Sequence, residues 1–309
     1  MRDGFLKVAV GSPDLRVADC AYNAAASARL LREAAAQRVK LLVLPELGLT
    51  GYSCGDLFLQ PVLLQGAEAA LEQLLQVSGE LGDLVAVAGL PVRVGGGLYN
   101  CAAVLQGGRL LGVVPKRNLP NYGEFYERRQ FTPGPFCGGE ISLCGQRIPF
   151  GADLLFCCRE LPDWVLGVEI CEDLWVPLPP SVGLALAGAT VLANPSASNE
   201  TAGKADYRRQ LVVGQSARLL AGYLYASAGA GESTAELVFA GHNLIAENGV
   251  LLAESPLLRG GLTCSELDLQ RLAFARSRRD PFPAPAGEYR RVSFSVLVEE
   301  TALTRAVER

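Results

Sequence analysis

The chain has 309 residues, half of them hydrophobic and 19% charged, a composition typical of a folded globular protein. The formal net charge is −4, and no basic block is longer than a pair such as Arg128-Arg129, which argues against a nucleic-acid partner. No apolar run is long enough to cross a membrane, and the first residues lead into a short strand rather than a signal peptide. We therefore expect a soluble, cytoplasmic protein that binds neither nucleic acid nor membranes.

Nine cysteines are dispersed along the chain without a C-x-x-C pair. The odd count, in a long chain without a signal peptide, predicts reduced thiols rather than a disulfide framework. Because there is a single histidine, His242, a zinc site would need almost only cysteine ligands, and the cysteine spacing does not support one. We therefore expect no metal, and we interpret His242 as structural because one histidine gives little support to Ser-His-Asp or Cys-His catalysis.

In chain order, short apolar runs alternate with segments of helical periodicity. The first half is predicted to contain strands at 6–11, 41–44 and 84–89, helices at 16–38 and 66–81, and a hairpin of 99–105 with 110–115. A loop rich in Pro, Gly and aromatic residues spans 118–135. The second half is predicted to contain strands at 164–171, 190–194, 223–228 and 237–240, helices at 181–187 and 205–220, and a hairpin at 245–251 around an Asn-Gly turn.

This order of elements predicts the fold class. Helices interleave with strands and hairpins are mixed in, which favours two mixed sheets covered by helices, in a single α/β domain spanning 1–309. The tail carries apolar segments at 262–267 and 292–298 on either side of the Pro-rich segment 280–287. We expect residues 260–309 to form an arm that packs on a partner rather than on the core.

Three apolar runs end in a single reactive residue: Leu41–Leu44 leads to Glu46, Val113-Val114-Pro115 to Lys116, and Gly167–Ile170 to Cys171. Ligand sites of α/β sheets collect at the carboxyl ends of strands, so the three residues are predicted to converge. Each alone has a plainer interpretation: a loop carboxylate, a solvated lysine and a core cysteine.

Together the three residues form an apparatus for cleaving amides. Cys171 can act as nucleophile, Glu46 can take the thiol proton and return it to the leaving ammonia, and Lys116 can stabilise the oxyanion. A backbone N–H after the cysteine, at Glu172 for instance, can complete the oxyanion site. The trio predicts a thiol amidohydrolase.

The same segments resemble the signatures of the nitrilase (carbon–nitrogen hydrolase) superfamily. The resemblance extends from Val8 to about Glu254, and Lys116 lies 70 residues after Glu46 and 55 before Cys171, a spacing similar to that superfamily's. Longer stretches resemble one branch, the N-terminal glutaminase domain of glutamine-dependent NAD synthetase. These stretches are Pro45–Phe58, Lys116–Arg129, Cys171–Trp175 and Asn194–Ser198.

The resemblance implies a four-layer α-β-β-α sandwich and a role for each matching residue. Cys171 would form a glutamyl thioester, with Glu46 as general base and acid, Lys116 as oxyanion stabiliser and Glu127 as the second glutamate that positions these groups. The substrate's ammonium would bind Glu172, its carboxylate Ser198 and Lys204, and the walls of the pocket would be Tyr52, Tyr122 and Trp175. The plainer alternatives are a solvated loop lysine for Lys204 and core packing for Tyr122 and Trp175.

The implied activity is hydrolysis of L-glutamine to glutamate and ammonia. The ammonia would pass to an ATP-dependent synthetase domain or subunit that makes NAD from nicotinic acid adenine dinucleotide. The chain has no Ser-Gly-Gly phosphate loop, Walker or G-x-G-x-x-G motif. We therefore expect no cofactor in this chain, with ATP and Mg²⁺ confined to an absent synthetase domain. The chain is expected to be an excised domain or a separate subunit, and a homo-oligomer through its outer helices and arm.

Two alternatives remain open. One is a free-standing amidase or carbamoylase of the same superfamily that acts on another small amide. Replacement of Glu172 or Lys204 would then spare simple amides. The other is a non-catalytic scaffold that docks the synthetase, for which Cys171→Ala would change no measurable property.

Overall fold

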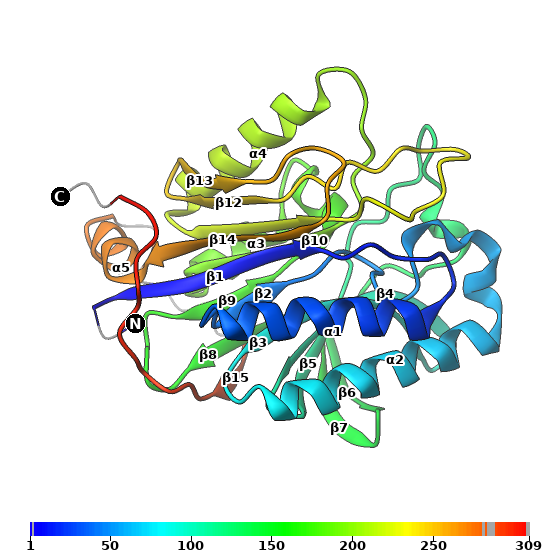
Figure 1. The fold of residues 1–309 in the computed structure, drawn as a ribbon, viewed down its shortest axis with the longest axis horizontal. Helices are drawn as coiled ribbons and strands as arrows, with labels where there is room; N and C mark the ends of the chain where they lie inside the picture. Colours follow the sequence, from blue (N-terminus) through cyan, green and yellow to red (C-terminus); the bar gives the residue numbers. More distant parts are fainter. Residues whose placement is uncertain (2, 280–281, 283–287, 307–309) are drawn as a thin grey trace.

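The structure is a computed structural model that describes residues 1, 3–279, 282 and 288–306. These residues form two β-sheets (Figure 1). The first sheet consists, in spatial order, of β14 (Gly261–Asp268), β1 (Phe5–Ser12), β2 (Leu41–Val43), β3 (Val85–Val94), β4 (Gly97–Gln106), β5 (Arg109–Pro115), β7 (Gln146–Gly151) and β6 (Cys137–Leu143). The second consists of β13 (Val250–Glu254), β12 (Leu244–Glu247), β11 (Gly222–Ser227), β10 (Val191–Ser196), β9 (Val165–Val168), β8 (Leu154–Cys158) and β15 (Arg290–Phe294).

Alternation of side chains along the strands produces three large cores in the described part of the chain, beside a small cluster of Ala197, Ala228 and Phe239. Val8 and Val87 of the first sheet pack with Leu166 and Leu224 of the second in a core between the sheets. The other face of the first sheet is covered by α1 (Cys20–Ala36) and α2 (Pro61–Glu80), and that of the second by α3 (Pro180–Leu186) and α4 (Lys204–Leu219). The result is the expected mixed α/β fold with two sheets between helices.

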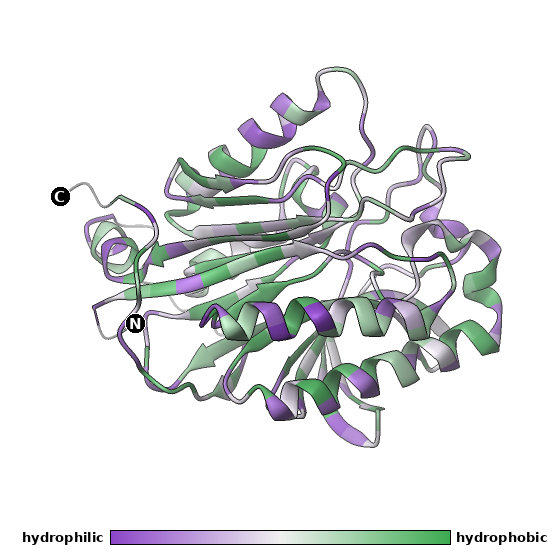
Figure 2. Ribbon diagram, in the orientation of Figure 1, coloured by the Kyte–Doolittle hydropathy of each residue, from purple (hydrophilic) through white to green (hydrophobic). Residues whose placement is uncertain are grey.

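The polarity of the outer helices agrees with this arrangement. Hydrophobic and hydrophilic bands alternate along α1 and α2, which lie side by side in front of the first sheet (Figure 2). In α1, the buried residues include Ala24, Leu31 and Ala34, at the spacing that places side chains on one helix face. No helix in the described part of the chain is both long and apolar enough to span a membrane.

Several element boundaries differ from the sequence prediction. Helix α1 begins at Cys20 rather than residue 16, because the Asp19 carboxylate accepts from the Tyr22 amide and caps the helix. Helix α2 begins at Pro61, five residues before the prediction, since proline is favoured in the first helical turn. Residues 237–240 do not form a strand, and only Phe239 makes a bridge, to Asn199. The hairpin β6–β7, strand β8 and helix α5 (Leu269–Ser277) were not predicted.

The expectation that the tail packs on a partner rather than on the core is wrong for its described strands. β14 pairs antiparallel with β1, β15 pairs parallel with β8, and Leu267 and Phe294 are buried in the core between the sheets. Beyond β15, the Thr304 hydroxyl donates to Glu266 of β14. The reason is that both segments complete sheets of their own chain. Apart from Phe282, the Pro-rich segment 280–287 lies outside the described residues.

Candidate active site

Cys171 lies where the chain leaves the second sheet. β9 ends at Val168, and Cys171 is the first residue of the short 3₁₀ helix η3 (Cys171–Leu174). Its φ of 45° is unusual for a residue other than glycine, and its backbone N–H donates to Asn194 Oδ1 at 2.9 Å. The Asp173 carboxylate holds the turn by accepting from the Ile170 amide at 3.0 Å. The cysteine is therefore fixed at a sharp strand-to-helix turn.

Glu46 follows β2 in a turn that packs directly on β3. The point of contact is Gly89, where a Cβ atom would lie 2.4 Å from both Leu47 N and Pro45 O. Real Cβ atoms do not approach backbone so closely, so only glycine allows the turn to lie there. The turn also contacts the second sheet, because the Glu46 amide donates to Ser196 O at 3.3 Å.

We expect Gly89→Ala to lower turnover about 100-fold, because the methyl group must displace the turn that carries Glu46, and a shift of about 1 Å at a catalytic group costs roughly that factor. Gly96→Ala, in the β3–β4 turn, is the matched control because a Cβ there meets nothing within 4 Å. Steady-state kinetics of both variants test this. Equal activity of the two would show that the turn adapts without moving Glu46.

Lys116, directly after β5, joins two glutamates in the interior. Its Nζ lies 2.6 Å from Glu46 Oε1 and 2.7 Å from Glu127 Oε1, and all three side chains are buried. Asn100 Nδ2 donates to Glu46 Oε1 at 2.7 Å, and the Tyr52 hydroxyl donates to Glu127 Oε1 at 2.8 Å. The structure thus brings together three of the four residues predicted to be catalytic in one hydrogen-bonded cluster.

The second oxygens of the two glutamates have no such contacts. Glu46 Oε2 and Glu127 Oε2 are buried and accept no hydrogen bond from the described residues. A carboxylate oxygen without a donor keeps its lone pairs free. In Glu46 this leaves one oxygen held by Lys116 and Asn100 and the other available for proton transfer.

Burial and charge together set the protonation of the site. Burial raises the pKa of Glu127 to about 7 against the opposing charge of Lys116. Burial lowers the Lys116 pKa, but Glu127 and Glu46 outweigh it and hold that pKa well above its ordinary value. Burial, followed by the Glu46 charge, raises the pKa of the Cys171 thiol. Lys116 is therefore a fixed cation, whereas Cys171 is a thiol that needs a base to become a nucleophile.

A pocket opens over Cys171. All six residues predicted to bind substrate line it, with Cys171 and Glu127. Glu46 and Lys116 do not line it and lie in the buried cluster. The sequence analysis missed four further lining residues, Pro120, Phe125, Ala197 and Asn199.

The polar side chains of the pocket are paired with one another. The Tyr122 hydroxyl lies 3.0 Å from both carboxylate oxygens of Glu172, and Tyr122 is 58% exposed, so it is not a core residue. Lys204 Nζ donates to Asn199 Oδ1 and lies 5.1 Å from the centre of the Trp175 ring. Lys204 is thus anchored at the start of α4 rather than solvated in a loop.

A chain of buried hydrogen bonds supports Cys171 from behind. The Asn194 side chain, which accepts from the Cys171 amide, donates through Nδ2 to the Tyr223 hydroxyl at 3.0 Å, and Tyr223 donates to Glu169 Oε1 at 2.5 Å. Glu169 Oε2 accepts from the Ser181 amide at 2.7 Å. In its ionised form Glu169 can only accept, and it then fixes the direction of every hydrogen bond back to Cys171.

Burial raises the pKa of Glu169 to about 7, which predicts a specific pH dependence. A carboxyl whose folded-state pKa is raised contributes stability at low pH and loses it as pH rises through about 7. We expect the free energy of unfolding of the wild type to fall about 3 kcal/mol more than that of Glu169→Gln between pH 4 and pH 8. Urea denaturation across this range measures the difference. Parallel curves would show that Glu169 does not titrate there.

The chain is similar to known proteins in sequence and in fold. The family model described as carbon-nitrogen hydrolase matches residues 7–277. The chain belongs to the carbon–nitrogen hydrolase family. It is 44% identical, over 99% of its length, to the glutamine-dependent NAD(+) synthetase of Mycobacterium bovis, and 31% identical over 90% to that of Acinetobacter baylyi. It covers 46% and 47% of those proteins, about half the length of the curated relatives it matches.

Solved structures share the fold of this carbon–nitrogen hydrolase. The glutamine-dependent NAD(+) synthetase of Cytophaga hutchinsonii superimposes with a TM-score of 0.74 at 30% identity, over 85% of this chain and 43% of that one. An amidase from Nesterenkonia sp. superimposes with a TM-score of 0.67 at 21% identity, over 90% of this chain and 97% of that one. The second likeness concerns the fold alone.

Proposed function

We propose that this carbon–nitrogen hydrolase converts L-glutamine to glutamate and ammonia through a thioester on Cys171. The observation that carries the proposal is the pocket over Cys171, where Glu172, Ser198 and Lys204 line the same space. A carboxylate suits the ammonium of an amino acid, and a lysine with a hydroxyl suits its carboxylate. The names of the relatives support glutamine as the amide donor.

In the acylation half of the proposed reaction, Glu46 takes the thiol proton on Oε2. The sulfur then bonds to the carboxamide carbon of glutamine, and the resulting oxyanion is stabilised by Lys116 and the Glu172 N–H. Glu46 returns the proton to the nitrogen, the carbon–nitrogen bond breaks and ammonia leaves. Because the Cys171 pKa is raised, the thiolate forms only when this base is present.

In the second half, water replaces ammonia. Glu46 takes a proton from the water, whose oxygen bonds to the thioester carbon. The carbon–sulfur bond then breaks, glutamate is released, and the proton returns to Cys171. Glu127, hydrogen-bonded to Lys116 and Tyr52, keeps the lysine protonated and oriented through both halves.

The fate of the ammonia belongs to the same proposal. The relatives are about twice as long as this chain, so we propose that an ATP-dependent synthetase domain or subunit receives the ammonia for NAD synthesis from nicotinic acid adenine dinucleotide. ATP and Mg²⁺ would act there rather than in this chain. Assembly as a homo-oligomer and a cytoplasmic location remain predictions.

The test is covalent labelling followed by intact mass and peptide mapping. A diazoketone analogue of glutamine is compared with a diazoketone of the same reactive end but no α-amino acid group. One adduct on Cys171, formed by the glutamine analogue alone, is the expected result. Equal labelling by both would favour an amidase acting on another small amide. Adducts scattered over other cysteines, with none on Cys171, would contradict the assignment of Cys171 as the nucleophile.

A further inference from the structure

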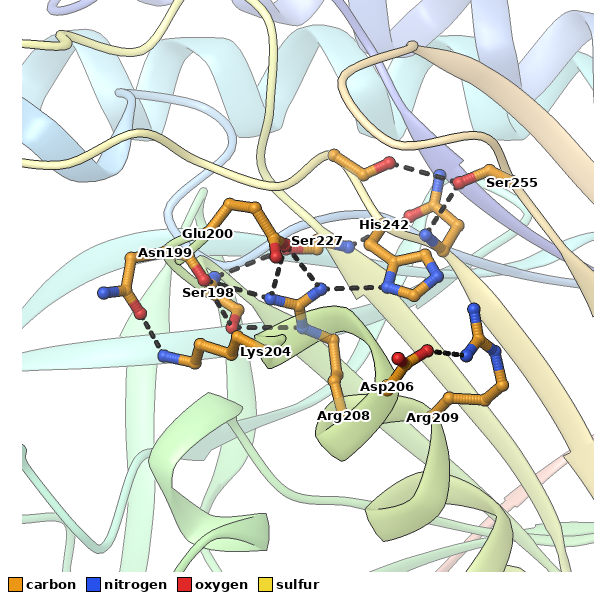
Figure 3. A network of polar contacts seen from close by, with 12 residues as sticks. Ser198, Asn199, Glu200, Lys204, Asp206, Arg208, Arg209, Ser227, His242 and Ser255 are labelled. Carbon is orange, nitrogen blue, oxygen red and sulfur yellow. Dashed lines mark hydrogen bonds and ion pairs between the residues drawn. The ribbon is translucent and has the colours of Figure 1, made fainter. Parts of the chain in front are cut away.

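A buried arginine lies behind the substrate pocket, on the first turns of α4. Arg208 has no exposed surface, and Figure 3 shows its guanidinium facing the segment 198–200. Nε donates to Ser198 Oγ at 3.2 Å, Nη2 to Asn199 O at 3.0 Å, and Nη1 and Nη2 to Glu200 Oε2 at 3.0 and 3.1 Å. Arg208 therefore holds three consecutive residues, and two of them, Ser198 and Asn199, line the pocket.

The charge of Arg208 determines how Ser198 can bind a ligand. Arginine stays protonated and can only donate, so its Nε–H occupies an acceptor position of the Ser198 hydroxyl. The hydroxyl proton of Ser198 must then point away from Arg208. Its acceptor is Asn199 O at 3.5 Å, a long contact that a closer acceptor in the pocket can replace. A carboxylate is such an acceptor, so Arg208 prepares Ser198 for an anionic group.

His242 contacts the guanidinium of Arg208. Its Nδ1 lies 2.9 Å from Arg208 Nη1 (Figure 3). Its Nε2 lies 2.6 Å from Glu254 Oε1. Since Arg208 only donates, Nδ1 must be the unprotonated nitrogen and Nε2 the one that donates to Glu254. If Nδ1 also carried a proton, two N–H donors and two positive charges would face each other across this contact, and they would repel.

The charged groups around His242 come from two elements. Arg208 and Arg209 face it from α4, and Glu254 faces it from β13. Burial and the charge of Arg208 lower the His242 pKa, although Glu254 opposes them. The imidazole is therefore neutral at neutral pH and gains its proton only under acidic conditions.

We propose that Arg208 and His242 are positioning residues that make recognition of the substrate's α-carboxylate dependent on pH. Arg208 holds Ser198 and Asn199 ready for the carboxylate, and protonation of His242 displaces Arg208 from them. This inference rests on the proposed glutamine activity. It predicts that lowering the pH weakens the preference for an α-amino acid substrate. Replacing His242 should not change the reactivity of Cys171 toward a simple electrophile.

The experiment measures second-order labelling rates of Cys171 between pH 5.5 and pH 8 with the two diazoketones. We divide the rate with the glutamine analogue by the rate with the diazoketone that lacks the α-amino acid group. In this ratio, the pH dependence of diazoketone reactivity and of thiol ionisation cancels, because both reagents share it. Burial also raises the pKa of Glu172, so the ratio can fall for a second reason. His242→Asn separates the two effects, because asparagine offers Arg208 an acceptor that does not titrate.

For the wild type we expect the ratio to fall further than for His242→Asn from pH 8 to pH 5.5, but by less than about tenfold, because the His242 pKa lies below its ordinary value. The two proteins should agree within about twofold at pH 8. Arg208→Met should lower the ratio at least about tenfold at pH 8, because the charged hydrogen bond to Ser198 is lost. At pH 5.5 its ratio should lie closer to that of the wild type, in which protonated His242 has already displaced Arg208 in part of the molecules. Arg218→Met, at an exposed position near the other end of α4, is the control and should match the wild type.

Other outcomes would overturn the inference in distinguishable ways. Identical pH profiles for the wild type and His242→Asn would remove His242 from the control of recognition. An equal loss with both reagents in Arg208→Met would show that the arginine only maintains the fold. A wild-type ratio near one at every pH would instead contradict the proposed glutamine activity, and the inference would fall with it.

Discussion

Replacement of Glu46 by glutamine is expected to lower turnover by about 10²–10⁴-fold, the usual contribution of a general acid–base group. The amide oxygen can still accept from Lys116 and Asn100, as Glu46 Oε1 does, so the site should keep its geometry. What disappears is the proton acceptor at Oε2, and with it the means of ionising a thiol whose pKa is raised.

Ammonia release and the thermal unfolding midpoint, measured on the same preparation, test this expectation. Glu33→Gln, an exposed carboxylate on α1, is the control for loss of a negative charge. The labelling rate of Cys171 should fall with turnover in Glu46→Gln. An unfolded variant would show that Glu46 is structural, and a folded one with full activity would require a different base.

Replacement of Lys116 by methionine is expected to lower the free energy of unfolding by about 3–5 kcal/mol at neutral pH, the cost of leaving buried charges without their partner. The reason is that Glu46 and Glu127 lie on either side of one ammonium, at 2.6 and 2.7 Å. The loss should be largest above pH 7 and shrink as pH falls, because Glu127, whose pKa is about 7 even beside Lys116, binds a proton more readily once that cation is gone.

The double variant Lys116→Met/Glu127→Gln separates charge from catalysis. Removing one of the two carboxylates should restore roughly half of the lost stability, because only Glu46 then remains as a buried anion. Turnover should stay abolished, since no cation faces the oxyanion. Denaturation and kinetics of the wild type, Lys116→Met, Glu127→Gln and the double variant make a complete double-mutant cycle. Recovery of turnover in the double variant would contradict the role given to Lys116.

The parts of this site that could be predicted lie where an apolar run ends. Glu46, Lys116 and Cys171 each follow a buried strand, and hydrophobicity marks such positions in a single sequence. Asn100 could not be found in this way, since it lies within β4 and nothing local separates a hydrogen-bonded asparagine from any other. Asn194 ends the predicted strand 190–194, but its hydrogen bond to the Cys171 amide has no local signal. Such residues are defined by partners far away in sequence.

Arg208 and Gly89 illustrate the same limit. Arg208 lies in a strongly polar helix, a composition that predicts an exposed side chain. It is nevertheless buried, because segment 198–200 folds over it. The need for glycine at position 89 comes from the Glu46 turn, about forty residues earlier. The fold class could be predicted from alternating periodicities, whereas the pairing of the tail could not, because strand partners separated by over 100 residues leave no local pattern.

The pairing of the last strands has a practical consequence for anyone shortening this chain. β14 covers the open side of β1, and β15 covers that of β8, so each is the outermost strand of a different sheet. A version cut at residue 260 would leave two rows of unpaired amide and carbonyl groups, which readily recruit strands from other molecules. Such a version would keep Glu46, Lys116 and Cys171 and would nevertheless aggregate, so an inactive truncation would say nothing about the chemistry.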